Sequence, residues 1–385
     1  MFSVISSGMV AVMTQNIGAG RPGVAYQARQ LGLAFNAVLG VIMSLFLSLG
    51  AGIILSGVGV ADALMQPAKT YLQIVGGFCI LNALIPICSS YLRAFGFSKE
   101  PLYASIIGNV INFCLNAFFL FVLHKGVAGV ATATVISRII NLVIVVLLGA
   151  VLVKAKQHPE RESNRAVMGQ IIRIGLPSAC ETAIYNVSMT LVIRFLNQMD
   201  AQGLNVTARS YTMQITNFSY CVGAALAQAN AIMTGWHIGA KEYDACDRGT
   251  KKAAVIGVIV AVILETVFTL CSGWIMQLFS KDPQMVSLVG KLLAIDIVLE
   301  IGRVTNLVYG QALKTSGDAV FPVVMGACFM ILCSVGGTYL FGIRLGLLAV
   351  GAYIGMTGDE CVRAVGMYLR WKSGKWKEKG LVKSR

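Results

Sequence analysis

Charged side chains are scarce in this sequence. Asp, Glu, Lys and Arg make up 12% of its 385 residues and hydrophobic residues 56%, whereas soluble domains carry about 25% charged residues. A soluble globular chain with so little charge could not cover its surface with polar groups, so the composition excludes that class. The mean hydropathy of +0.74 indicates a lipid solvent and predicts an all-α, polytopic membrane protein.

Groups for metal binding and catalysis are few and scattered. The three histidines, His124, His158 and His237, are not clustered, and none of the ten cysteines forms a CxxC pair. We therefore expect no metal centre, no disulfide, no resident cofactor and no enzymatic activity. The sequence has no Walker phosphate-binding motif, which argues against ATP-driven work by this chain.

Long apolar runs are abundant instead. A bilayer core about 30 Å thick needs about 20 apolar residues per helix, and the breaks between the runs carry Gly, Pro and charge. A shorter run, 1–16, is typical of the end of another helix, so ten or eleven transmembrane helices are predicted. The long runs cover residues 30–56, 70–92, 101–123, 127–153, 168–197, 204–234, 252–278, 285–313, 321–342 and 347–369.

Lysine and arginine set the predicted orientation. Of the 31 basic residues, 22 fall on one side of the predicted helices, seven fall on the other, and two, Arg138 and Arg303, fall inside helices. Cytoplasmic loops carry the excess of positive charge, so the first side and the C-terminus are predicted to be cytoplasmic in a plasma (inner) membrane. The basic segment 372–385 is then expected on the anionic membrane surface rather than on nucleic acid.

The chain contains an internal repeat. Ile17-Gly18-Ala19 resembles Ile238-Gly239-Ala240, and Gly96 with Pro101 matches Gly317 with Pro322, all at one constant offset in residue number (238 − 17 = 317 − 96 = 221). The offset predicts two pseudo-symmetric helical bundles that run in the same membrane direction, which is a transporter architecture. The predicted lobes are residues 1–153 and 168–371, joined by a cytoplasmic linker, 154–167.

The offset also predicts missing helices at the front. Residue 1 corresponds to residue 222, so the counterpart of about 165–221 has no equivalent in the first lobe. We expect an N-terminally truncated form of a twelve-helix architecture that lacks the first helix and most of the second.

Several motifs resemble the MATE (multidrug and toxic compound extrusion) family of transporters, in its bacterial form. The segment Gln15 to Arg21 is similar to that family's loop after the second helix, and Gly175-Leu176-Pro177-Ser178 with Glu181 to the start of its seventh. Gly317-Asp318 with Phe321-Pro322 resembles a later loop, and Asp359-Glu360 with Arg363, Arg370-Trp371 and Lys375-Trp376 resembles one bacterial ending.

The resemblance implies a secondary active transporter. It implies export of organic, often cationic compounds such as drugs and toxins, by antiport with sodium ions or protons through alternating access. It also implies two six-helix lobes around a central cavity. Family members often carry an ion-coupling aspartate on the first helix, for which this sequence offers no position.

Ionisable residues within apolar runs are functional candidates because burying them in a membrane is costly. Asp296, Glu300 and Arg303 lie four and three residues apart, on one helix face. Two nearby carboxylates in a low dielectric cannot easily both stay charged, so Arg303 is expected to keep Glu300 ionised while Asp296 takes up the coupling ion. The equivalent residues of the first repeat are Val75, Cys79 and Asn82, so the charged site is predicted for the second lobe alone.

Two further carboxylates are candidates. Glu181 follows Pro177 by four residues, and a proline kink frees carbonyl oxygens for a cation. A sodium ion at Asp296, Glu300 and Glu181 is one hypothesis, and pairing of Glu181 with Arg173 is the alternative. Glu265 lies in the middle of an apolar run without a local partner.

Polar and charged residues elsewhere give weaker predictions. Arg138 and Asp359 are equivalent under the offset, and a bridge between them would close a cytoplasmic gate; Glu360 is expected to pair locally with Arg363. The predicted cavity-lining residues are Asn186, Tyr211, Gln214 and Asn217, with Glu265 as a further candidate.

Two alternative functions stay open. A lipid-linked oligosaccharide flippase of the same superfamily would line its cavity with several cationic residues, whereas the intramembrane charges here are mostly acidic and favour small organic cations as substrates. An inactive truncated fragment is the other alternative. A monomer in contact with membrane lipid is expected.

Overall fold

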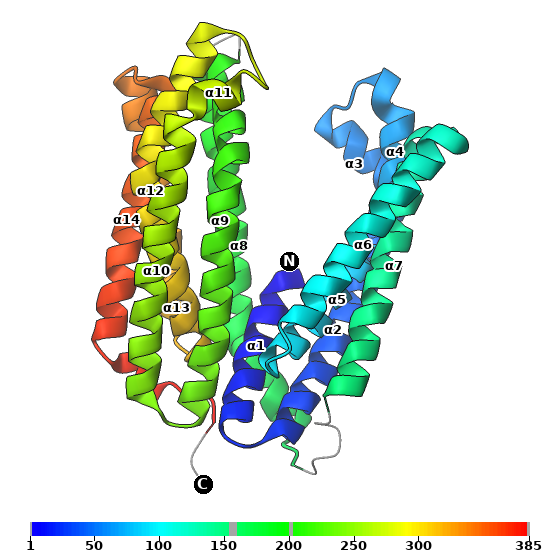
Figure 1. Ribbon diagram of the computed structural model, residues 1–385, viewed down its shortest axis with the longest axis vertical. Coiled ribbons are helices and arrows are strands. Elements are labelled where there is room, and N and C mark those ends of the chain that lie inside the picture. The colour runs from blue at the N-terminus through cyan, green and yellow to red at the C-terminus, as the bar shows by residue number, and fades with distance from the viewer. Residues whose placement is uncertain (1, 154–159, 200–202, 383–385) are drawn as a thin grey trace. The chain divides into compact units, whose positions relative to one another are not determined.

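The computed structural model describes residues 2–153, 160–199 and 203–382, and in these ranges the fold is all-α without strands. The first helices are α1 (Phe2–Gly18), α2 (Pro22–Leu49), α3 (Ala51–Val58), α4 (Asp62–Gly77), α5 (Ile80–Ala94), α6 (Lys99–Ala117), η1 (Phe118–Val122), α7 (Gly126–Leu152) and α8 (Asn164–Met199). They are followed by α9 (Leu204–Gly239), α10 (Tyr243–Leu270), α11 (Ser272–Met276), α12 (Pro283–Thr315), α13 (Val320–Phe329), η3 (Met330–Val335), η4 (Thr338–Arg344), α14 (Leu348–Lys372) and η5 (Lys375–Glu378) (Figure 1).

The helices form two compact units, Met1–Gly175 and Leu176–Arg385, which divide inside α8. The sequence analysis places the division in the linker 154–167, of which residues 154–159 lie outside the described residues. The end of that linker is tied to the first unit, because Glu162 pairs with Arg21 and its carbonyl accepts a hydrogen bond from Gln27 at 2.7 Å. The start of α8 also packs closely on α1, where Gly8 lies against the backbone of Ile171.

The two units repeat one plan, as the offset predicts. The starts of helices α2 and α10 (243 − 22) and the ends of α5 and α12 (315 − 94) differ by the same offset, and π-helical turns occur at the matching segments η1 and η4. Gly96 and Gly317 have φ angles of 90° and 97°, which glycine adopts without steric cost. Each therefore ends its helix with the same left-handed turn.

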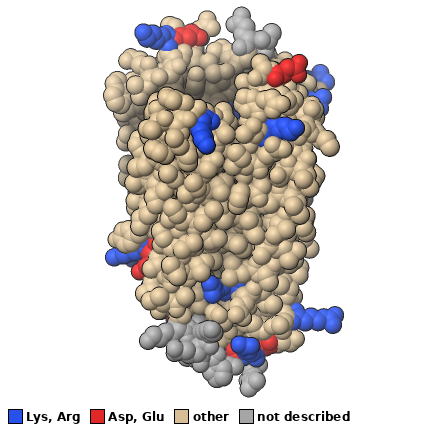
Figure 2. All heavy atoms as spheres, turned by 90° about the vertical axis from the view of Figure 1, so that its right-hand side faces the viewer, with Lys and Arg blue, Asp and Glu red and all other residues tan. Residues whose placement is uncertain are grey.

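Apolar surface suits both units to a membrane. Five helices, α2, α6 with η1, α7, α10 and α13 with its π-helical continuation, are long and apolar enough to cross a bilayer, and α4 with α5, bent by 42°, would make a sixth. On the face drawn in Figure 2, charged side chains gather toward the two ends and leave a wide belt without charge. The remaining long helices, α8, α9, α12 and α14, carry polar and charged side chains within their length.

The described part of the basic C-terminal segment folds back onto the second unit. The Trp376 ring stacks on Trp371 with centroids 4.1 Å apart, and its indole N–H donates to the Trp371 carbonyl at 2.9 Å. The Lys379 ammonium and the Arg370 guanidinium both donate to the buried Asp318 carboxylate at 2.7 Å. Residues 375–382 thus fasten the end of α14 to the turn between α12 and α13.

Helix α12 is central to the second unit, where it packs against α9, α10 and α14. It approaches α14 most closely at Gly302. A Cβ atom at this position would lie 2.9 Å from the Cys361 nitrogen and from the Glu360 carbonyl carbon. The missing side chain therefore lets the two backbones touch, as small residues do between membrane helices.

Replacing Gly302 with alanine is expected to separate α12 from α14 and to lower the free energy of unfolding by about 1–3 kcal/mol, as overpacking does. The measurement is the thermal unfolding midpoint of the purified protein in detergent. Gly249→Ala on α10 is the matched control, since nothing lies within 4 Å of its added Cβ. Equal midpoints for the two variants would contradict the close packing inferred at Gly302.

Candidate functional site

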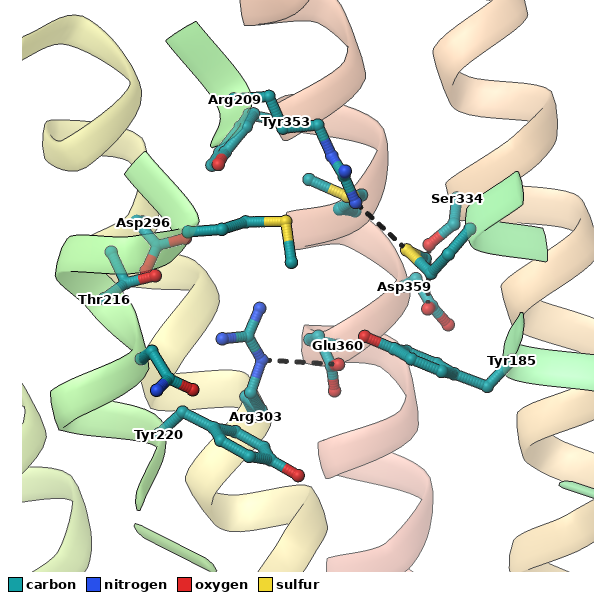
Figure 3. A pocket seen from close by; sticks show the side chains of 14 residues that line it. Tyr185, Arg209, Thr216, Tyr220, Asp296, Arg303, Ser334, Tyr353, Asp359 and Glu360 are labelled. Carbon is teal, nitrogen blue, oxygen red and sulfur yellow. Dashed lines mark hydrogen bonds and ion pairs between the residues drawn. The ribbon is translucent and has the colours of Figure 1, made fainter. Parts of the chain in front are cut away.

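A cavity of about 230 Å³ lies within the second unit, among α8, α9, α12, η3 and α14 (Figure 3). Its lining combines aromatic, thioether and charged side chains. We call it the upper cavity; its lining residues are Tyr185, Met189, Arg209, Met213, Thr216, Asn217, Tyr220, Asp296, Arg303, Ser334, Tyr353, Met356, Asp359 and Glu360.

A second cavity of about 360 Å³ adjoins it, and the two share Tyr185, Tyr220, Arg303 and Glu360 as lining residues. This lower cavity is also lined by Glu181, Asn186, Asn306, Lys314 and Arg363. Apolar walls with a few convergent polar groups are typical of small-molecule sites. The two cavities together are therefore the candidate binding region.

Arg303 joins α12 to α14 at this place. Its Nη1 donates to Glu300 Oε2 at 2.7 Å, the pair that the spacing predicts, and its Nε lies 3.8 Å from Glu360 Oε1 (Figure 3). Glu360 is held further by Arg363 at 2.9 Å and by the Asn306 amide at 3.0 Å. The network thus gives Glu360 two cationic neighbours and one amide donor, and it gives Glu300 one cationic donor.

Three carboxylates on α10 and α12 lack such donors on at least one oxygen. Among the described residues, neither oxygen of the fully buried Glu265 has a hydrogen-bond partner. Asp296 is 2% exposed, and its Oδ2 and Glu300 Oε1 are likewise without a partner there. The helices that carry them, α10 and α12, pack against each other. A buried carboxylate without donors is costly when ionised, so this acidic cluster is suited to take up a proton or another cation.

Asp359, one half of the predicted gate, has its partners within the second unit. Arg363 donates to both of its oxygens, at 2.7 and 3.1 Å, and the Ser334 hydroxyl donates at 2.9 Å. Arg363, one helical turn away, thus satisfies the carboxylate locally, and the bridge to Arg138 on α7 of the first unit stays a prediction.

Glu181 also differs from expectation. Its carboxylate pairs with Lys314 of α12 at 2.5 Å, and not with Arg173. It lines the lower cavity, whereas Asp296 lines the upper one. In the described residues no three His, Cys, Asp or Glu side chains are arranged to hold a metal ion, so the structure does not bring Glu181, Asp296 and Glu300 together at a shared sodium site.

Two of the five predicted cavity-lining residues face the two cavities, whereas Tyr211, Gln214 and Glu265 do not. Asn186 lines the lower cavity and Asn217 the upper one. Tyr211 packs instead on Phe279, with ring centroids 5.4 Å apart, and Gln214 is exposed. The reason is helical spacing: the lining positions of α9 are 209, 213, 216, 217 and 220, and Tyr211 and Gln214 lie on other faces.

Arg209 is the important residue that the sequence analysis misses, since it counts there only as a loop charge. It lies in the second turn of α9 and is 7% exposed. A stripe of buried polar residues at helical spacing marks this face: Asn205, Arg209, Thr212, Thr216 and Ser219. That stripe is readable in the sequence.

The charge balance of the cavities also differs from the prediction that the intramembrane charges are mostly acidic. Basic and acidic lining residues are equal in number. The basic ones are Arg209, Arg303, Lys314 and Arg363; the acidic ones are Glu181, Asp296, Asp359 and Glu360. The sequence analysis counts Lys314 and Arg363 with the cytoplasmic loops, but both lie within long helices and point inward.

Comparisons with known proteins agree on one family. The family model described as MatE matches residues 1–118 and 177–340. The chain is 32% identical over 388 residues to the uncharacterized transporter YisQ of Bacillus subtilis, covering 99% of this chain and 85% of that one. It is 22% identical to the probable multidrug resistance protein NorM of Thermotoga maritima, over 98% and 82% of the two chains. The crystal structure of MATE in the bent conformation matches with a TM-score of 0.88 at 18% identity, covering 98% of this chain and 84% of that one.

The Glu300–Arg303 pair gives a test of the network. Arg303→Met is expected to destabilise the protein by about 3 kcal/mol, because it leaves the buried Glu300 charge without its donor. Adding Glu300→Gln removes that charge and is expected to restore most of the loss. Thermal unfolding of both purified variants checks this, and equal destabilisation of the single and double variants would show that Glu300 does not depend on Arg303.

Proposed function

Because this chain belongs to the MATE family of membrane transporters, we propose that it exports organic compounds, drugs and toxins among them, by antiport with protons or sodium ions. The relatives named as multidrug resistance proteins support the export of varied compounds. The excess of basic residues on one side supports a plasma-membrane orientation with a cytoplasmic C-terminus.

The acidic cluster is the observation that carries the coupling step. Glu265, Asp296 and Glu300 are all buried, each has at least one oxygen without a hydrogen-bond partner, and the only ion pair of the three is Glu300 with Arg303 in the described part of the chain. Ionising the other two would leave buried negative charge uncompensated, at several kcal/mol for each group. Proton uptake removes that charge without needing a complete shell of oxygen ligands, so a proton suits the site most simply.

Asp296 connects this cluster to the binding region. It lines the upper cavity, whereas Glu265, which lies on α10, is buried against the neighbouring helices. A proton or sodium ion on Asp296 changes the charge that an organic cation in the cavity meets. Ion and substrate then stabilise different states of the transporter, and this difference in affinity drives alternating access.

A lipid-linked oligosaccharide flippase is the second candidate. The basic residues Arg209, Arg303, Lys314 and Arg363 line the cavities, and cationic side chains suit the phosphates of such a substrate. The antiporter comes first because each of these except Arg209 already has a carboxylate partner.

Export of a fluorescent organic cation from cells or proteoliposomes tests the proposal. Asp296→Asn and Glu265→Gln each remove a titratable group from the acidic cluster, so gradient-driven export is expected to fall at least about tenfold, as for the loss of one essential proton carrier. A protonophore should abolish export by the native chain, and a sodium ionophore should not; the reverse result would assign sodium as the coupling ion.

Asp244→Asn is the matched control, because Asp244 lies on the same helix as Glu265 but is exposed. This variant should export at the native rate. Coupled export that persists in both cluster variants would overturn the assignment of the cluster. Failure of the well-folded native chain to export organic cations, with translocation of a lipid-linked oligosaccharide, would establish the flippase.

A further inference from the structure

We propose that the upper cavity binds an acid group of the transported compound at Arg209, and that this chain therefore prefers zwitterions to simple cations among the compounds it exports. The inference rests on the proposed export function and deepens it by naming the substrate class.

Arg209 is a buried cation without an anionic partner in the part of the chain that the structure describes. It is 7% exposed, its Nη2 reaches the Met189 thioether at 3.6 Å, and its Nε is buried without any hydrogen-bond partner. No carboxylate among the described residues lies within ion-pair distance of it. The other two arginines of the cavities, Arg303 and Arg363, each contact two carboxylates.

A guanidinium group presents five N–H donors in a planar fork, and a thioether sulfur is a weak acceptor. Leaving such a group buried and unpaired is costly. Figure 3 shows Arg209 beside Tyr353, with its side chain extending in front of α14 toward the side of the cavity on which Ser334 lies. The arrangement therefore lacks one component, a carboxylate, sulfonate or phosphate supplied by a ligand, which a guanidinium binds through two parallel hydrogen bonds.

The opposite charge is available in the same cavity. Asp296 has an oxygen without a hydrogen-bond partner among the described residues, and Asp296, Tyr353 and Arg209 all line this cavity. Tyr185 and Tyr220 supply aromatic faces, against which a ring system packs well. A compound with an acid group, an aromatic body and a cationic group matches all three features, whereas a simple cation leaves Arg209 unpaired.

Two probes that differ by one methyl group separate these classes. One is a rhodamine with a free carboxylate, which is a zwitterion, and the other is its methyl ester, a cation of nearly the same size. Binding to the purified full chain in detergent is followed by fluorescence anisotropy. The native protein is expected to bind the acid about tenfold or more tightly than the ester, as charge-assisted hydrogen bonds in a buried site provide.

Variants at Arg209 identify the group responsible. Arg209→Gln should weaken binding of the acid to the level of the ester and leave the ester unchanged, and Arg209→Lys, which retains the charge, should keep part of the preference and verify that the fold tolerates substitution. Arg194→Gln is the matched control, because Arg194 is an exposed arginine on α8 outside the cavity. It should bind both probes as the native chain does.

Equal native affinity for the two probes, or an equal loss for both in Arg209→Gln, would overturn the inference. Displacement of the acid probe by short-chain phosphatidylglycerol, but not by an unlabelled aromatic zwitterion, would also overturn it and assign the site to a lipid headgroup. The binding assay uses no ion gradient. Coupled export without any preference for the acid would therefore refute this inference alone, and acid binding without export would refute only the proposed function.

Discussion

The second unit depends on the contact of α12 with α14 at Gly302. Since no Cβ separates the two backbones there, Arg303 comes within ion-pair distance of Glu360, and Asn306, one turn further, reaches the same carboxylate. Two membrane helices that carry several charged residues at this level are thus held by packing and by ion pairs together. Arg303 and Glu360, which lie beside this contact, line both cavities. The packing of α12 on α14 therefore fixes the positions of these charged side chains.

Much of the fold could be predicted from the sequence because helix ends are local events. Gly96 and Gly317 mark equivalent left-handed turns, and one constant offset in residue number therefore locates most equivalent boundaries. The pairing of Glu300 with Arg303 could also be predicted from the sequence, since both residues lie on one helix. The pairing of Glu181 with Lys314 could not be predicted, because the two residues are far apart in the sequence and a single sequence does not show which helices are in contact. Arg209 was missed because a charge near a helix end is ordinarily a topological signal, and only its burial distinguishes it.

The two bundles share a helical frame but not its chemistry. The counterpart of α12 in the first unit is α4 with α5, which is bent by 42°; the break falls at Phe78 and Cys79, and Cys79 is equivalent to Glu300. Where the second unit has a continuous helix with an ion pair, the first has a kink without charge. One repeated frame thus provides one bundle whose continuous central helix carries buried carboxylates and one bundle with a bend at the equivalent level.

The folded-back C-terminal segment has a consequence for biosynthesis. Trp376, Lys379 and Leu381 complete the packing around Asp318 and Trp371, yet a ribosome delivers them after every long helix of the unit has been made. During synthesis, the Asp318 carboxylate in the turn between α12 and α13 therefore has Arg370 but not Lys379 as a partner until residues 375–382 have been made. A chain that stops before residue 375 would therefore lack both the Lys379 partner of Asp318 and the Trp376 ring that stacks on Trp371.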